Sequence, residues 1–336
     1  MGKTQTVFAG DGNDSITLGE NWFTTKAYGG SGNDTFSMPA MGIYGSFYGG
    51  DGDDVFDTDN DTAARGMFNV SLVRAGAGND KITALYSATT SKIYGEDGDD
   101  KIIQSGAILE TVVGGDGNDI IYGVDGTTLA APPLGPAYGY GDFSLAEVAA
   151  DPSLATVGGD DKIYGGDGLQ APQTVAAGPG NDIVIMGSGG TSNYRVMGDN
   201  ASITGMALDN ENEADGDDIL QMGNQFIGTV KMYGQGGNDK LIGGYNSLGG
   251  EQQEFLFGGS GDDKIWMVSP ENRALDVYGA PINVGYGNLG DDTIYGTDDF
   301  DRLAGDNTLK SSSEDTIVAD DLVGGNDVIN GYAGDD

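Results

Sequence analysis

Aspartate recurs along the chain as the last residue of short glycine-rich hexads, such as GGSGND at residues 29–34 and GGDGDD at residues 49–54. Glycine at the first, second and fourth positions permits backbone conformations that are closed to other residues, so carbonyl oxygens can turn toward one point. The carboxylate at the sixth position then completes the oxygen shell. Six to eight oxygen ligands at flexible geometry suit Ca²⁺, whereas Mg²⁺ fits such a turn less well. The hexads therefore predict calcium sites.

Ten hexads follow this pattern closely, and five weaker copies follow it in part. The ten end at Asp14, Asp34, Asp54, Asp80, Asp100, Asp119, Asp182, Asp239, Asp263 and Asp292. The weaker copies end at Asp161, Asp218, Asp315, Asp327 and Asp336. Among these we expect the copies at Asp161, Asp218 and Asp315 to bind weakly or not at all. Glu96, Gln235 and Asn288 replace glycines in otherwise regular hexads, which we expect to matter little.

Two short apolar runs flank the hexads and predict the elements that position them. An apolar residue such as Ile16 or Phe36 stands two places after the aspartate in fourteen of the fifteen copies, and a run such as Phe47-Tyr48 precedes many hexads. Each repeat therefore predicts one strand entering the turn and one leaving it. Successive aspartates lie 20, 20, 26, 20 and 19 residues apart over the first six copies. A fixed period of this length indicates a solenoid with about twenty residues per coil.

Three stretches, GGSGNDTFS, GGDGDDVFD and GGDGNDIIY, resemble the nonapeptide GGxGxDxUx, with U a large apolar residue, of the repeats-in-toxin (RTX), or hemolysin-type calcium-binding, family. The resemblance implies an all-β, right-handed parallel β-roll in which each Ca²⁺ lies between two adjacent turns, held by turn carbonyls and the sixth-position aspartate. The aspartate ligands that it implies are Asp14, Asp34, Asp54, Asp80, Asp100, Asp119, Asp161, Asp182, Asp218, Asp239, Asp263, Asp292, Asp327 and Asp336. The turn glycines that it implies are Gly29, Gly30, Gly32, Gly49, Gly50, Gly52, Gly114, Gly115, Gly117, Gly258, Gly259 and Gly261.

The arrangement of the repeats departs from that family in one respect. Family members often repeat every nine residues and so place calcium turns on both edges of the roll. Here one edge is regular and the opposite edge is built from variable loops, so we expect one ladder of Ca²⁺ along one edge, in about fourteen or fifteen coils.

We expect residues 1–336 to form a single elongated domain with three loop excursions, at about 123–157, 185–213 and 268–286. Prolines exclude regular strands in part of the first, where Asp142 could cap a short helix over residues 143–150. The second could hide a degenerate coil around Val196–Asp199. The excursions are either contact surfaces or insertions tolerated on the calcium-free edge.

Charge and composition exclude several classes of function. The formal net charge is −38, which makes nucleic acid an implausible partner and would repel an anionic membrane surface. Neither cysteine nor histidine occurs, so disulfides, Ser-His triads and zinc sites of the His or Cys type are excluded. No run of 18 apolar residues is present, and the amino terminus has no apolar signal core.

A catalytic constellation is not evident either, so we expect no enzyme. An enzyme acting on acidic polysaccharide would need a basic groove, and the arginines are scattered. They are Arg65, Arg74, Arg195, Arg273 and Arg302.

The features together predict an extracellular structural or assembly protein, of the surface-layer or filament type, that folds on a ladder of Ca²⁺. Without Ca²⁺ an acidic, glycine-rich chain cannot offset its conformational entropy and self-repulsion. That behaviour suits type I export in the RTX family, although the family's carboxyl-terminal secretion signal is not seen. Uncapped ends would let the roll polymerise head to tail as a homo-oligomer. The alternative is a calcium-dependent spacer or folding module of a larger secreted adhesin, toxin or hydrolase.

Overall fold

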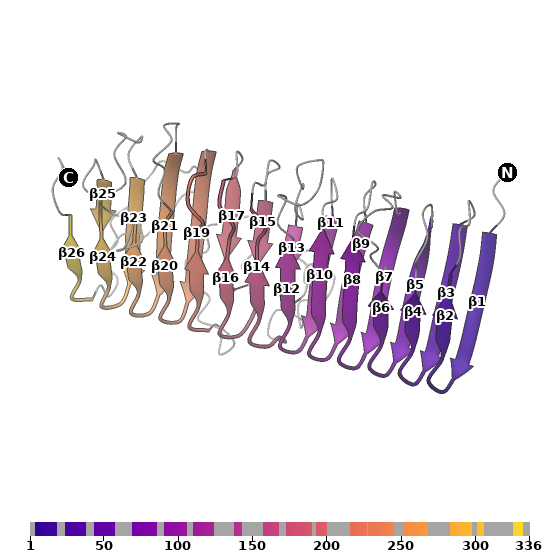
Figure 1. The fold of residues 1–336 in the computed structure, drawn as a ribbon. Coiled ribbons are helices and arrows are strands. Elements are labelled where there is room, and N and C mark those ends of the chain that lie inside the picture. The colour runs from indigo at the N-terminus through magenta and orange to yellow at the C-terminus, as the bar shows by residue number, and fades with distance from the viewer. Residues whose placement is uncertain are drawn as a thin grey trace.

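The computed structural model contains only strands and turns in the part of the chain that it describes. The strands lie side by side in a long row that extends from the N-terminal to the C-terminal end (Figure 1). The described residues are 4–18, 24–37, 44–57, 69–85, 91–105, 110–123, 138–142, 157–167, 173–189, 193–199, 216–226, 228–244, 252–267, 283–297, 301–305 and 325–331.

The odd-numbered strands form one parallel sheet of 13 strands, sheet A, in which each strand pairs with the next odd-numbered one. They are the strands that enter the glycine-rich turns. Their bounds are β1 (Thr4–Asp11), β3 (Thr24–Ser31), β5 (Tyr44–Asp51), β7 (Asn69–Ala77), β9 (Ser91–Asp97), β11 (Glu110–Asp116), β13 (Tyr138–Tyr140), β15 (Gln173–Ala176), β17 (Tyr194–Met197), β19 (Gly228–Gly236), β21 (Gln252–Ser260), β23 (Asn283–Leu289) and β25 (Asp301–Ala304).

The even-numbered strands form a second parallel sheet of 13 strands, sheet B, and they leave the same turns. Two parallel sheets built coil by coil from one chain confirm the predicted parallel β-roll. The bounds are β2 (Ser15–Thr17), β4 (Thr35–Ser37), β6 (Val55–Asp57), β8 (Lys81–Leu85), β10 (Lys101–Ser105), β12 (Ile120–Gly123), β14 (Lys162–Tyr164), β16 (Ile183–Ile185), β18 (Ile219–Gln221), β20 (Lys240–Ile242), β22 (Lys264–Trp266), β24 (Thr293–Tyr295) and β26 (Val328–Asn330).

The sequence period sets the register, because equivalent residues of successive repeats pair with each other. Gly10 lies opposite Gly30, which lies opposite Gly50. The pairing shifts once in β5, between Gly45 and Ser46, where the spacing to the next repeat is longer. The hexads therefore remain aligned along the roll although the segments between them vary in length.

The core lies between the sheets and is filled by the apolar residue that the sequence places two positions after each aspartate. That residue is buried in every described coil from Ile16 to Ile294, whereas Ile329 in β26 is 45% exposed. Phe36 and Phe56 stack with their ring centroids 4.5 Å apart, and Phe47 of sheet A is fully buried as well. Burying a side chain of this size contributes about 1.5–3 kcal/mol.

All three predicted excursions contain residues that form strands. Tyr138–Tyr140 form β13 inside the excursion predicted at 123–157, and Asn283 begins β23 before the end of the one predicted at 268–286. Those parts of the prediction are wrong. The degenerate coil suggested at residues 196–199 corresponds to the end of β17 and the turn after it. The helix predicted over 143–150 lies outside the described residues.

Candidate metal centre

The glycine-rich turns join each strand of sheet A to the following strand of sheet B and line one edge of the roll (Figure 1). The backbone at the second and fourth hexad positions has positive φ, +127° at Gly30 and +117° at Gly32. A Cβ at Gly30 would also collide with the carbonyl oxygen of Gly10 in the preceding coil. Glycine is therefore favoured both by the backbone conformation and by the stacking of one turn on the next, although Glu96, Gln235 and Asn288 adopt positive φ at the second position of their hexads.

Replacing Gly50 by alanine is expected to destabilise the roll by about 2–5 kcal/mol, since φ is +124° there and the new Cβ would collide with the Gly30 carbonyl oxygen. Gly139 in β13 is the matched control, because a Cβ there would find its nearest neighbour, Val175 Cγ2, at 3.9 Å. We expect Gly139→Ala to change stability by less than about 1 kcal/mol. The measurement is the urea midpoint of each variant in saturating calcium, and equal losses in the two would contradict this account.

The sixth-position aspartates stack in a continuous ladder, which we call the Asp ladder. The backbone N–H of Asp34 donates to Asp54 Oδ1 at 2.7 Å, and the N–H of Asp54 donates to Asp80 Oδ1 at 2.6 Å. Every described coil makes this bond to the next one, at 2.6 to 3.0 Å. Its members are Asp14, Asp34, Asp54, Asp80, Asp100, Asp119, Asp161, Asp182, Asp218, Asp239, Asp263, Asp292 and Asp327.

The five weaker copies of the hexad fall into two groups: three lie in the Asp ladder, and two lie outside the described residues. Asp161, Asp218 and Asp327 occupy ordinary places in the Asp ladder, and how strongly they bind calcium stays a prediction. Asp315 and Asp336 lie outside the described residues. The ladder passes directly from Asp292 to Asp327, so Asp315 adds no step between them. The described residues form thirteen coils, and the prediction of fourteen or fifteen includes the two copies that lie outside them.

The second carboxylate oxygen of the ladder aspartates is buried and lacks a hydrogen-bond donor in most coils. Asp34 Oδ2 lies against Gly29, where an added Cβ would collide with it and would lie 2.7 Å from the carbonyl oxygen of Gly49. A carboxylate oxygen and a carbonyl oxygen of the next coil thus share a space walled by glycine. Unpartnered Oδ2 atoms occur in Asp14, Asp34, Asp54, Asp80, Asp100, Asp119, Asp161, Asp182, Asp218 and Asp263. Gly49, Gly114 and Gly258 repeat the glycine wall.

Buried carboxylate oxygens without a donor fit a cation. Leaving such an oxygen uncompensated costs several kcal/mol, and a bound divalent ion would remove that cost. No group of three or more acidic side chains gathers around one point in the described part of the chain. An ion held by the Asp ladder therefore takes most of its oxygens from backbone carbonyls, which Ca²⁺ accepts readily. The ordered glycine turns would hold the ion, and the ion would supply the missing positive charge.

Burial raises the pKa of eight ladder aspartates, and neighbouring carboxylates raise it further, whereas the N–H donated to Oδ1 lowers it; the eight are Asp54, Asp80, Asp100, Asp119, Asp161, Asp182, Asp218 and Asp263. The pKa of Asp54 rises to about 6 and that of Asp100 to about 8. At Asp161, burial and then the charge of Asp142 raise the pKa to about 11. In the absence of a cation these eight aspartates therefore bind protons near neutral pH, and a cation has to displace them.

A second ladder, which the sequence analysis missed, runs along the exposed side of the same turns at the fifth hexad position. The N–H of Asn33 donates to Asn13 Oδ1 at 2.9 Å, and the N–H of Asp53 donates to Asn33 Oδ1 at 3.1 Å. These bonds point toward the preceding coil, opposite to those of the Asp ladder. The later members are Asn79, Asp99, Asn118, Asp160, Asn181, Asp217, Asn238, Asp262, Asp291 and Asn326. The available signal was that each of these hexads has Asn or Asp there.

Two insertions interrupt the glycine-rich turns themselves. Residues 143–156 follow Asp142, and residues 200–215 follow Asp199, each at the second hexad position. Asp142 Oδ1 accepts the N–H of Gly159 at 3.1 Å, and Asp199 Oδ1 accepts that of Gly216 at 3.3 Å, so each aspartate bridges the two sides of its insertion. Insertion on the calcium-free edge, one of the two alternatives given for the excursions, is therefore excluded for these two.

The opposite edge is also more regular than predicted in part of its length. The N–H of Ser188 donates to Asp167 Oδ1 at 2.6 Å, and the N–H of Asn224 donates to Ser188 Oγ at 3.0 Å. A Cβ at Gly187 would collide with the carbonyl oxygen of Gly166. Small residues thus stack turn on turn here too, without a ladder of aspartates.

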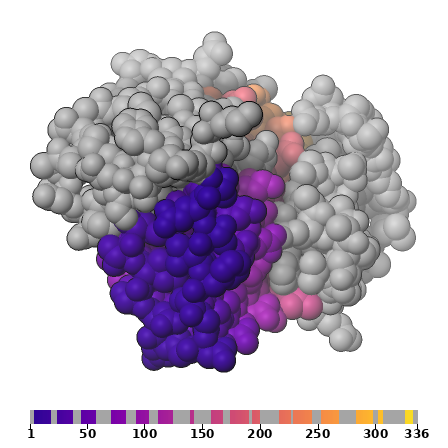
Figure 2. Space-filling model, turned by 90° about the vertical axis from the view of Figure 1, so that its right-hand side faces the viewer, coloured from indigo at the N-terminus to yellow at the C-terminus, as the bar shows by residue number. Residues whose placement is uncertain are grey.

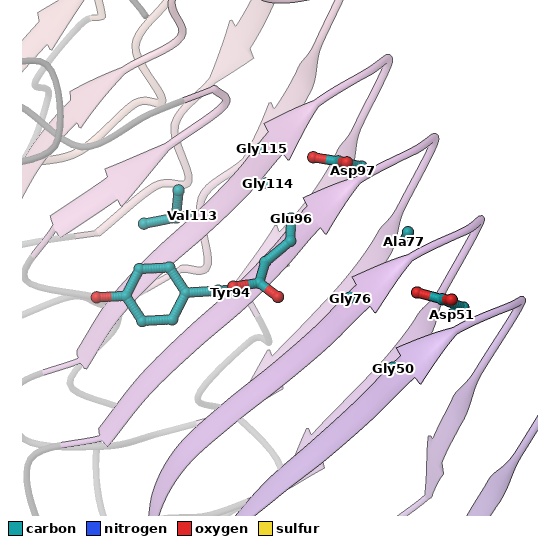
Figure 3. Close-up of a pocket in the computed structure, with 10 residues that line it drawn as sticks. All are labelled: Gly50, Asp51, Gly76, Ala77, Tyr94, Glu96, Asp97, Val113, Gly114 and Gly115. Atoms are coloured by element: carbon teal, nitrogen blue, oxygen red, sulfur yellow. The ribbon is translucent and has the colours of Figure 1, made fainter. Parts of the chain in front are cut away.

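A hollow of about 460 Å³ lies beside the turns, on the face of sheet A that points away from the core (Figure 3). Asp51, Glu96 and Asp97 line it together with Tyr94, and no basic side chain does. Arg74, stacked 4.6 Å from the centroid of the Tyr94 ring, forms an ion pair with Glu96. The hollow therefore lacks the basic lining that binding of an acidic polysaccharide would need.

No helix long and apolar enough to cross a membrane occurs in the described ranges. A search of curated proteins found no match to the chain.

The family model of the RTX calcium-binding nonapeptide repeat matches residues 4–21, 110–127, 154–168, 230–245, 248–266, 286–308 and 323–336. These segments include Asp14, Asp119, Asp161, Asp239, Asp263, Asp292 and Asp327 of the Asp ladder. The matched segments, which recur along the parallel β-roll, show that the chain contains RTX, or hemolysin-type, calcium-binding nonapeptide repeats in several copies.

Proposed function

We propose that this calcium-binding repeat protein is an extracellular structural or assembly component, of the surface-layer or filament type, without catalytic activity. In this proposal residues 1–336 form one elongated domain that folds on a ladder of Ca²⁺. The observation that carries the proposal is the Asp ladder, in which an aspartate recurs in each of the thirteen described coils and is buried in eleven of them.

The net charge of the chain supports an extracellular location. Its net charge of −38 opposes compaction until cations neutralise the carboxylates. Calcium sites in extracellular modules bind with dissociation constants of about 10⁻⁴ to 10⁻³ M, so such sites fill outside the cell and remain empty at cytosolic calcium levels. A chain of this kind crosses an export channel unfolded and folds on arrival.

The two ends of the described roll support assembly between copies. Phe8 in β1 is 74% exposed, and at the other end Val328 and Ile329 in β26 are 52% and 45% exposed. Phe8 stacks on Tyr28 with ring centroids 4.8 Å apart. It lies in β1, the first strand of sheet A, at the N-terminal end of the roll, which faces the viewer in Figure 2. We propose that β25 and β26 of a second copy stack on β1 and β2, continuing both sheets, so that subunits join head to tail.

Sedimentation velocity across a calcium titration, from chelator to several millimolar, tests the proposal. We expect compaction followed by growth into large species that chelator dissolves. Magnesium at equal concentration is the control for charge screening. Phe8→Ser is expected to compact in calcium as the native chain does but to grow less. Compaction to a stable monomer would contradict the assembly role and favour the spacer module, and no response to calcium would overturn the proposal entirely.

A further inference from the structure

We propose that Asp142 and Asp161 together hold one Ca²⁺ more tightly than the single-carboxylate sites of the Asp ladder. The inference rests on the calcium-dependent folding proposed above and adds a site of its own. The second hexad position is usually glycine, so no side chain enters the turn there. Asp142 brings a second carboxylate into a turn that already contains Asp161.

The backbone fixes where Asp142 lies. Its N–H donates to the carbonyl oxygen of Ala177 in the next coil at 2.9 Å. The residue before it, Gly141, lies against Asp161 Oδ2, because a Cβ added at Gly141 would collide with that oxygen. The same Cβ would collide with the carbonyl oxygen of Ala177. Asp142 therefore directly follows the residue that borders the space between Asp161 Oδ2 and the carbonyl oxygen of Ala177.

The Asp142 side chain is fully buried, and its two oxygens differ. Oδ1 accepts the N–H of Gly159 at 3.1 Å. Oδ2 is buried and has no hydrogen-bond partner. It lies against Gly158 and Gly178, either of which would collide with it if a Cβ were added. Glycines on two sides thus leave room for this oxygen, and no donor is provided for it.

The turn that contains Asp142 and Asp161 has negative charge that a bound cation would compensate. Asp161 also has a buried, unpartnered Oδ2, so the turn contains two uncompensated carboxylate oxygens. No described lysine or arginine forms an ion pair with either residue. Because calcium affinity increases with the number of charged ligands, two carboxylates make this the strongest site of the roll.

Asp199 occupies the same hexad position two coils further on, but its side chain has no oxygen without a hydrogen-bond donor. Its Oδ1 accepts the N–H of Gly216 at 3.3 Å, and its Oδ2 accepts the N–H of Gly236 at 3.1 Å. Both of its oxygens therefore have backbone donors. The second-position aspartate is a turn acceptor there, so the tighter ion belongs to the turn of Asp142 and Asp161 and not to the turn of Asp199.

The test is a calcium binding isotherm of the full chain, measured by equilibrium dialysis at low free calcium, for the native chain and two variants. The native chain is expected to bind one ion about tenfold more tightly than the others. Asp142→Asn is expected to lose that ion and keep the rest. Asp160→Asn is the matched control: it makes the same charge change in the same coil, at an exposed fifth position where the neighbouring coils have Asn118 and Asn181.

An unchanged tight site in Asp142→Asn would overturn the inference while leaving the ladder of weaker sites, and with it the proposed function, in place. Absence of calcium binding in all three chains would overturn both. Circular dichroism in saturating calcium checks that each variant is folded. If Asp142→Asn did not fold, the native isotherm alone would decide, because an isotherm without one tighter ion also overturns the inference.

Discussion

Removing calcium with a chelator at neutral pH is expected to unfold the entire roll. Each described coil contributes an aspartate to one continuous ladder, and most of these aspartates have a buried oxygen without a donor. A ligand that binds only the folded chain stabilises it by about 2.7 kcal/mol for each site when its concentration is a hundredfold above the dissociation constant. That contribution recurs along the ladder, so its loss exceeds the effect of any single substitution.

Circular dichroism and amide hydrogen exchange would measure this unfolding. The strand signal should disappear in chelator and return when calcium is added back, with protection of core strands such as β9 restored. Sodium chloride at matched ionic strength is the control, because it screens the negative charge without occupying sites. Retention of the strands in chelator at neutral pH would show that the carboxylates are compensated in some other way.

Acidification is expected to stabilise the calcium-free chain, contrary to the usual behaviour of acidic side chains. The pKa of Asp80, Asp100 and Asp182 is about 8 in the folded chain, against an ordinary value of 3.8, chiefly because these carboxyls are buried. The folded chain therefore holds protons that the unfolded chain releases. This contribution to stability is fully present below about pH 4 and is lost as the pH rises through about 8.

Unfolding in urea with chelator present, compared at about pH 5 and about pH 8, would measure this dependence. The roll should resist urea better at the lower pH. In saturating calcium the difference in stability between the two pH values should decrease or change sign, since protons then compete with the bound ion. Asp99 serves as a contrast, because hydrogen bonds from Asn118 lower its pKa and its stabilising effect is lost in acid. A chelated chain that is more stable at the higher pH would contradict the raised pKa values.

The parts of the fold that sequence could predict are those in which one residue type has one physical use. A glycine at Gly30 and an apolar residue at Phe36 recur with a fixed spacing, and each has a single role in a coil. The turns, the core and the aspartates of the ladder were therefore predictable. The fifth-position ladder was not, because Asn and Asp are common in any turn and their presence did not indicate a bond to the next coil.

The site at Asp142 could not be predicted from the sequence for a different reason. Its hexad is divided by residues 143–156, so Gly141 and Asp161 do not read as one turn. The recurring pair Gly-Asp at residues 141–142 and 198–199 was the signal that could have located both divided turns. Its meaning depends on the register of Ile121 with Ile163, which only the three-dimensional structure provides.

The bonds between coils have a mechanical consequence, because they all run along the axis of the roll. A force applied along that axis loads the coils in series, and the weakest coil opens first while the others remain folded. Each coil occupies about 4.8 Å of the folded length. When opened, its twenty or so residues extend to about 70 Å. The roll would therefore lengthen in discrete steps under tension, and the dissolved calcium concentration would set the force at which each step occurs.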